Sequence, residues 1–116
     1  MVTVNQQLLK GTLDGALLLV ISNGETYGYE ITTKLEAMGF LSIAAGTIYP
    51  ILQKLEREGY ISSKMSKSSD GPKRKYLTLT EEGKLRLQTF LVDWSELISA
   101  MANLIKETGN DKHHQK

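Results

Sequence analysis

The sequence predicts a mainly α-helical domain with one small β-hairpin. Two observations indicate this fold class. Over most of the 116-residue chain, apolar residues recur every three or four positions, which is the spacing of one helix face. Residues 60–79 differ, because two short β-prone runs there flank a turn at Asp70-Gly71-Pro72. The pattern therefore predicts four helices, with the hairpin between the third and the fourth.

The first two helices are separated by a short turn that contains glycine. The first helix is expected over about 4–22, and Asn23 and Gly24 end it because both tolerate a left-handed backbone. Thr26 is the expected N-cap of the second helix, which Gly39 ends. Each helix carries an apolar face that can contribute to a core.

A third helix ends at Glu58, with Gly59 as its stop, and begins between Ser42 and Thr47. Pro50 leaves its start open, since a proline inside a helix removes a hydrogen bond. Its apolar face is expected to point inward and comprises Ile48, Ile51, Leu52 and Leu55. Its opposite face is polar and carries Thr47, Tyr49, Gln53, Lys54 and Arg57.

The hairpin of residues 60–79, hereafter the wing, contains the positive charge of the chain. Its two strands are expected over 60–65 and 74–79. The wing has five basic residues and one acidic residue, a net charge of +4, whereas segments 1–59 and 80–116 carry −2 and −1. This concentration indicates an electrostatic contact with an anionic partner, although a hairpin that is basic only for solubility would show the same pattern.

The last helix begins at Thr80, its expected N-cap, and Glu81 and Glu82 in its first turn complement the helix dipole. It extends to about residue 106 and carries an apolar band in which three sets of residues repeat every seven positions. The band comprises Leu87, Phe90, Leu91, Trp94, Leu97, Ile98, Met101, Leu104 and Ile105. Such a band is typical of a homodimer interface, although one subunit could also bury it as core. Residues 107–116 are polar and are expected to form a disordered tail.

These elements in this order predict a winged helix-turn-helix. A DNA-binding domain is expected over 1–79 and a C-terminal dimerisation helix over 80–106. The third helix would enter the major groove of double-stranded DNA, which admits a helix, and the wing would lie along the phosphates. The expected DNA contacts are Thr47, Tyr49, Gln53, Lys54, Lys64, Lys67, Lys73, Arg74 and Lys75. The alternative is a winged-helix module that binds a protein partner and has no specific DNA binding.

The third helix also carries a longer motif, Gly46-Thr47-Ile48-Tyr49-Pro50 followed by Leu52, Lys54, Leu55, Glu56, Arg57, Glu58 and Gly59. This motif resembles the signature of the PadR family of transcriptional regulators, apart from Ile48, where most members have leucine. Segments 9–14, 27–31 and 71–83 are similar to other parts of the family pattern. The resemblance covers about residues 8–105, and the single C-terminal helix is similar to that of the short subgroup.

The resemblance implies a repressor that dimerises through its C-terminal helix, binds a palindromic operator and is released by a small molecule or a stress signal. Trp94, the only tryptophan, lies in the apolar band. One hypothesis is that two copies of Trp94 line a pocket between subunits and stack on a flat aromatic or drug-like effector. The alternative is that Trp94 is a bulky anchor in the dimer core.

Composition and motif content exclude several functional classes. The chain has no cysteine, which excludes disulfides, thiolate zinc sites and cysteine nucleophiles. It has no P-loop and no dinucleotide-binding glycine motif, and His113 and His114 stand alone in the tail. No enzyme activity, cofactor or metal is therefore expected. No apolar run approaches the roughly 20 residues that span a bilayer and no secretory signal is visible, so we expect a cytoplasmic protein.

Overall fold

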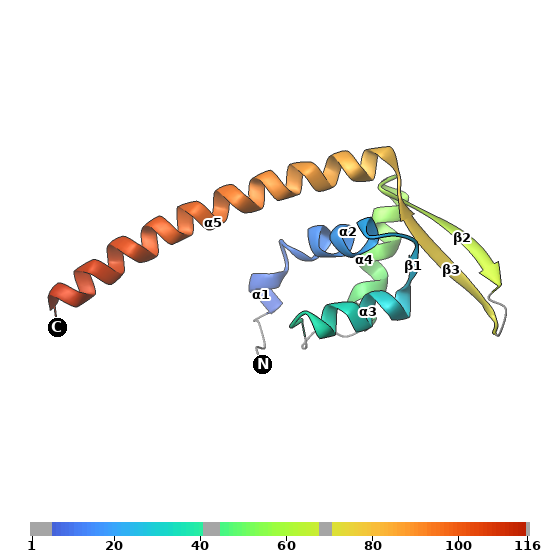
Figure 1. The fold of residues 1–116 in the computed structure, drawn as a ribbon, viewed down its shortest axis with the longest axis horizontal. Helices are drawn as coiled ribbons and strands as arrows, with labels where there is room; N and C mark the ends of the chain where they lie inside the picture. The colour runs from blue at the N-terminus through green and yellow to red at the C-terminus, as the bar shows by residue number, and fades with distance from the viewer. Residues whose placement is uncertain (1–5, 41–44, 68–70, 116) are drawn as a thin grey trace.

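The computed structural model shows a small helical body, a β-sheet at one end and a long helix that leads away from the sheet (Figure 1). The backbone is described for residues 6–40, 45–67 and 71–115, and side chains for residues 8–40, 46–66 and 71–109. The helices of the body are α1 (Gln6–Leu9), α2 (Leu13–Ser22), α3 (Gly28–Ala37) and α4 (Ala45–Arg57). The sheet contains β1 (Thr26–Tyr27), β2 (Ile61–Lys67) and β3 (Lys73–Leu79), and the long helix is α5 (Glu81–Gln115). The predicted fold class is confirmed.

The sheet is antiparallel, with β3 between β1 and β2. β2 and β3 pair along their full length, as the hairpin pattern predicts. β1 is a strand that the sequence analysis did not anticipate, and it places Thr26 opposite Leu77 and Tyr27 opposite Tyr76. Two residues are too few for an alternating pattern to be visible in a sequence.

The expected N-cap role of Thr26 is wrong. α3 begins at Gly28, and its N-cap residue, Tyr27, makes no side-chain capping hydrogen bond. The Thr26 hydroxyl donates to Glu30 Oε1 across 2.9 Å. Because the backbone of Thr26 pairs with β3, the helix can start only after that strand ends.

The prediction of a single first helix over 4–22 is also wrong, because the helix is interrupted between α1 and α2. Gly11, a poor helix former, lies in the break. The backbone N–H and the hydroxyl of Thr12 both donate to the Leu9 carbonyl, across 2.8 and 2.9 Å. This tight turn leaves Leu9 and Leu13 buried in one core, so the apolar spacing continues across the break. The start expected near residue 4 lies outside the described residues.

α4 begins at Ala45, within the range that the sequence left open. Pro50 therefore lies inside the helix, where it leaves the Gly46 carbonyl without the amide donor four residues further on. The predicted inward face of α4 is confirmed. Its members are buried or half-buried against the core, namely Ile48, Ile51, Leu52 and Leu55.

The core lies among α2, α3, α4 and the sheet. Its fully buried side chains are Leu17, Leu18, Ile21, Ile31, Ile48 and Leu55. α5 joins this core through buried Leu87 and half-buried Phe90, whose ring packs on Gly15 of α2. Residues 91–108 of α5 are all exposed, so most of this helix lies outside the core of its own chain. The helix is described to Gln115, beyond residue 106, and the disorder of the tail stays a prediction.

Candidate nucleic-acid interface

The outward face of α4 lies next to the wing. Four side chains expected on this polar face are exposed, namely Thr47, Tyr49, Gln53 and Arg57. α4 contacts β2 as well as α2 and α3, which holds its inward face in the core. In this arrangement one elongated ligand can contact the exposed helix face and the adjacent wing together.

A hollow of about 210 Å³ lies between α4, the start of α3 and β3. Its lining residues are Gly28, Tyr49, Leu52, Gln53, Glu56, Lys75 and Leu77. The Tyr49 ring lies against Gly28 at the start of α3, where a Cβ atom would have no room. Tyr49 is still 45% exposed, so its ring is oriented by packing on one side and open on the other.

Lys54 is an expected contact on α4 that forms an ion pair with another helix. Its ammonium group forms an ion pair with Asp14 of α2 across 2.7 Å, and the two side chains are 41% and 31% exposed. The pair links α4 to α2. Any anion that binds Lys54 has to compete with this carboxylate.

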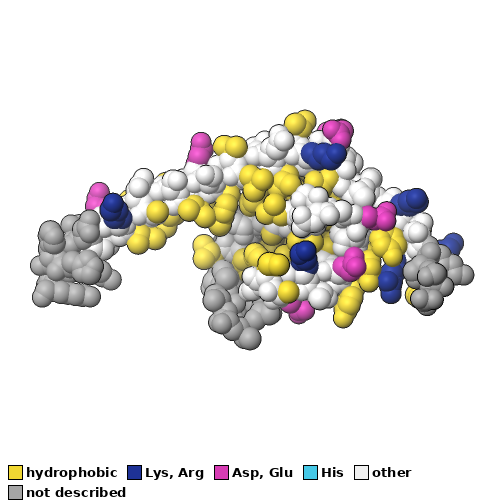
Figure 2. Space-filling view, viewed as in Figure 1, with side chains coloured by type: hydrophobic (Ala, Val, Ile, Leu, Met, Phe, Trp, Pro, Cys, Tyr) yellow, Lys and Arg dark blue, Asp and Glu magenta, His cyan; other side chains and the backbone are white. Residues whose placement is uncertain are grey.

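The basic side chains of the wing divide into two kinds. Figure 2 shows basic side chains at the end of the molecule where the wing lies. Lys64 and Lys73 are exposed and form no ion pair with another described residue. Arg74 is half-buried, with its guanidinium 4.5 Å from the centre of the Tyr27 ring. Lys75 is paired with Glu56, and the side chain of Lys67 lies outside the described residues.

Strand alternation explains why neighbouring cations have different partners. Arg74 contacts Tyr27 in β1. Tyr27 also makes an edge-to-face contact with Tyr76, with the ring centroids 5.4 Å apart. Lys75, on the other face of β3, reaches Glu56 of α4 across 2.9 Å. Arg74 and Lys75 therefore each have a partner within the chain, which the sequence does not show.

Glu56 also belongs to this surface, although it is not among the residues expected to contact DNA. Its carboxylate accepts a hydrogen bond from the Ser63 hydroxyl at 2.5 Å and pairs with Lys75. The Ser63 hydrogen bond, followed by the contact with Lys75, lowers the pKa of Glu56 below its ordinary value of 4.5. In the sequence, Glu56 follows Leu52 by four residues, so the two side chains lie on the same face of a helix that precedes a basic hairpin. This spacing is the signal from which the role of Glu56 could have been predicted.

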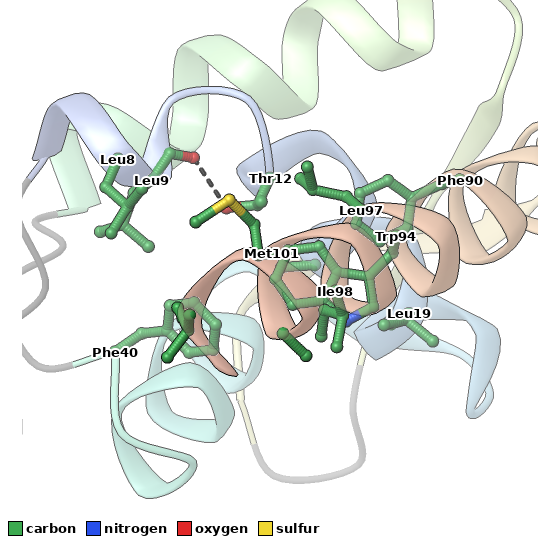
Figure 3. Close-up of a pocket in the computed structure, with 13 residues that line it drawn as sticks. Leu8, Leu9, Thr12, Leu19, Phe40, Phe90, Trp94, Leu97, Ile98 and Met101 are labelled. Carbon is green, nitrogen blue, oxygen red and sulfur yellow. Dashed lines mark hydrogen bonds between the residues drawn. The ribbon is translucent and has the colours of Figure 1, made fainter. Parts of the chain in front are cut away.

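A second surface feature is an apolar groove of about 690 Å³ between α5 and the N-terminal helices. Its lining residues are Leu8, Leu9, Thr12, Ala16, Leu19, Phe40, Phe90, Trp94, Leu97, Ile98, Met101, Ala102 and Ile105. The side chains of α5, of the N-terminal segment and of Phe40 face a common space (Figure 3). Within it, the rings of Phe90 and Trp94 are stacked with centroids 6.2 Å apart.

Part of the apolar band of α5 lines this groove. Trp94 lines it, as do Phe90 and four further band residues, whereas Leu87 lies in the core. Seven band residues are 40–64% exposed, namely Leu91, Trp94, Leu97, Ile98, Met101, Leu104 and Ile105. The structure therefore leaves a continuous apolar surface uncovered along α5 (Figure 2).

Among the residues that the structure describes, no group of three or more His, Cys, Asp or Glu side chains could hold a metal ion. Over the same ranges, no helix combines the length and the apolar character needed to cross a membrane.

The part of the chain from within α2 to the start of α5 matches a known family. The model of the transcriptional regulator PadR-like family matches residues 17–89. The chain belongs to the PadR-like family. The resemblance carried by the third-helix motif is thereby confirmed, and the family consists of transcriptional regulators rather than enzymes.

Solved and curated PadR proteins are similar to this chain to different extents. A crystal structure of a PadR-like transcriptional regulator from Bacillus cereus has a TM-score of 0.80 and 41% identity, covering 85% of this chain and 96% of that one. The negative transcriptional regulator PadR of Bacillus subtilis is 37% identical over 79 residues, which are 66% of this chain and 43% of that protein. The crystal structure of Bacillus subtilis PadR in complex with operator DNA has a TM-score of 0.62 and 34% identity, covering 69% of this chain and 46% of that one. This chain thus spans less than half of the Bacillus subtilis regulator.

Proposed function

We propose that this PadR-like protein is a sequence-specific DNA-binding repressor that acts as a homodimer on a palindromic operator. The observation that carries the proposal is the exposed polar face of α4 beside the exposed lysines of the wing. The solved complex of Bacillus subtilis PadR with operator DNA supports it, because the similarity covers 69% of this chain.

In the proposed complex, α4 lies in the major groove and the wing lies along the phosphate backbone. Thr47, Tyr49 and Gln53 are the candidates for contacts with base edges, because they are exposed on α4. Lys64 and Lys73 are the strongest candidates for phosphate contacts, since they are exposed and form no ion pair with another described residue. Lys67, Arg74 and Lys54 stay in the expected set, although the last two have partners within the chain. Lys75 was also expected to contact DNA, but its ion pair with Glu56 competes with a phosphate contact.

The proposed dimer uses the apolar band of α5. An uncovered apolar surface of this length is uncommon in a monomer and is typical of an interaction site. A second copy of the same helix would cover it with closed two-fold symmetry, in which each subunit presents the same surface. The two copies of α4 would then lie about one DNA turn apart, ~34 Å, which matches a palindrome.

The proposed effector is a flat aromatic molecule that stacks on Trp94 in a pocket between the two subunits, to which the groove of each chain contributes. The lining is apolar, and the hydroxyl of Thr12 already donates to the Leu9 carbonyl. The stacked rings of Phe90 and Trp94 offer an aromatic face to such a ligand. Because α5 forms both the groove and the proposed dimer interface, ligand binding would shift the spacing of the two DNA-binding units.

Fluorescence anisotropy of labelled DNA from the upstream region of the gene tests the proposed function. We expect tight binding that weakens steeply with salt and that a scrambled DNA cannot match. Binding that is weak at low salt and equal for both DNAs would contradict specific recognition and favour the protein-interaction alternative. Since operator DNA in bacteria lies in the cytoplasm, the proposed repressor acts there.

A further inference from the structure

Glu56 connects α4 to both strands of the wing. One carboxylate oxygen, Oε2, accepts the hydrogen bond from Ser63 in β2. The other oxygen, Oε1, lies 2.9 Å from the ammonium group of Lys75 in β3. Because each oxygen has its own partner on a different strand, the side chain restricts how the wing sits relative to α4.

The same contacts determine which charges a DNA molecule meets. Lys75 borders the hollow that Tyr49 and Gln53 also line, so it lies at the junction of the two proposed DNA-contacting elements. The ion pair of Lys75 and Glu56 has a net charge of zero. The exposed charges of Lys64 and Lys73 lie elsewhere in the wing and have no such partner among the described residues.

We infer that Glu56 is a positioning residue for specific DNA recognition, which orients the wing against α4 and keeps Lys75 out of contact with phosphates. This inference rests on the proposed DNA-binding function. Glu56 raises specificity in two ways, because it fixes the geometry needed for the operator and removes a positive charge that any DNA sequence would attract. In this inference Lys75 binds Glu56, whereas Lys73 binds a phosphate of the DNA.

Four substitutions separate this role from direct DNA contact. Glu56→Gln keeps an oxygen for Ser63 but loses the ion pair, which releases Lys75 to bind a phosphate. Glu58→Gln is the matched control, because it makes the same change of charge on an exposed residue two positions further along the chain. Lys75→Met and Lys73→Met compare two exposed lysines of β3, of which Lys75 is paired with Glu56 and Lys73 has no ion-pair partner among the described residues.

The test measures anisotropy with operator and scrambled DNA over a series of salt concentrations. For Glu56→Gln we expect tighter binding to scrambled DNA, a lower operator-to-scrambled ratio and a salt slope steeper by about 0.9, the value of one phosphate contact. Glu58→Gln should leave the ratio and the slope near those of the unmodified protein. Lys75→Met should not reduce the slope, whereas Lys73→Met should reduce it by about 0.9.

The inference is overturned if Lys75→Met reduces the slope as much as Lys73→Met, or if Glu56→Gln behaves like Glu58→Gln. Amide hydrogen exchange without DNA gives an independent readout. Exchange in β2 and β3 should be faster in Glu56→Gln than in Glu58→Gln, and equal exchange would also overturn the inference. A protein with no operator preference but with this difference in exchange would contradict the proposed function alone, so the two failures are distinguishable.

Discussion

Gly83, in the first turn of α5, packs against the backbone carbonyl of Tyr60, which leaves no room for a side chain at position 83. The same carbonyl accepts the backbone N–H of Thr80 across 3.1 Å. The Thr80 hydroxyl donates to the Gly59 carbonyl and accepts the N–H of Gly83, which confirms Thr80 as the N-cap of α5. These contacts fix where the long helix leaves the junction of α4 and β2.

Gly83→Ala is therefore expected to destabilise the fold, although alanine normally favours a helix. The added methyl group forces the start of α5 away from Tyr60, and overpacking of this kind costs about 1–3 kcal/mol. Gly109→Ala is the control, because it adds the same methyl group to the same helix in open space. Thermal unfolding followed by circular dichroism should show a lower Tm for Gly83→Ala only. Equal Tm values for the two variants would contradict the proposed close contact.

Reversal of the exposed wing charges, Lys64→Glu with Lys73→Glu, is expected to weaken operator binding by at least about 10-fold at low salt. The physical reason is that two phosphate contacts become repulsive. The control is Lys84→Glu on α5, whose side chain pairs only with exposed Glu81 among the described residues. Anisotropy with the upstream DNA measures the effect. Unchanged binding in the double variant would show that the wing does not contact the phosphates.

Leu97→Glu is expected to abolish the proposed dimer. Leu97 is 53% exposed in the single chain, so the chain should still fold, but a dimer would bury the new charge. Leu85→Glu is the control, because Leu85 is 63% exposed on the same helix but lies outside the apolar band. Sedimentation should show a monomer for Leu97→Glu and a dimer for Leu85→Glu. A dimer in both would place the interface elsewhere.

Trp94 fluorescence reports directly on the groove, since the chain has one tryptophan. Planar aromatic molecules are expected to quench it by stacking beside Phe90 and Trp94. Ala102→Phe should weaken this quenching about 10-fold because Ala102 lines the groove, whereas Ala100→Phe, outside the lining, should not. Sedimentation of both variants checks that the oligomeric state is unchanged. Weak quenching across a whole panel of aromatics would rule out the effector site.

The lowered pKa of Glu56 predicts how its contribution depends on pH. A carboxyl group whose pKa is lower in the folded chain stabilises the fold above its ordinary pKa, here 4.5, and loses this effect as the pH falls through the lowered value. The difference in Tm between the unmodified protein and Glu56→Gln should be constant between about pH 6 and 8 and shrink below pH 4.5. A difference that grows on acidification would contradict the assigned contacts with Ser63 and Lys75.

The elements of the fold were largely visible in the sequence, because they depend on local patterns. The inward face of α4, the pairing of the wing strands and the N-cap at Thr80 follow from spacing and from turn or cap chemistry. The errors occurred where a pattern was too short or a tertiary contact prevailed. β1 has only two residues, and Thr26 pairs with β3 instead of capping α3.

The partners of the charged side chains were decided only by the tertiary structure. The sequence determined that the wing is basic and that one face of α4 is polar. It did not determine that Lys54 would meet Asp14, 40 positions away, or that Lys75 would meet Glu56. Spacing within one helix or strand shows which face a side chain occupies, but the neighbour on that face depends on how the elements pack. For this protein, the sequence therefore determined that the surface of α4 and the wing is polar and basic. The packing of the elements determined which of its charged side chains have a partner within the chain.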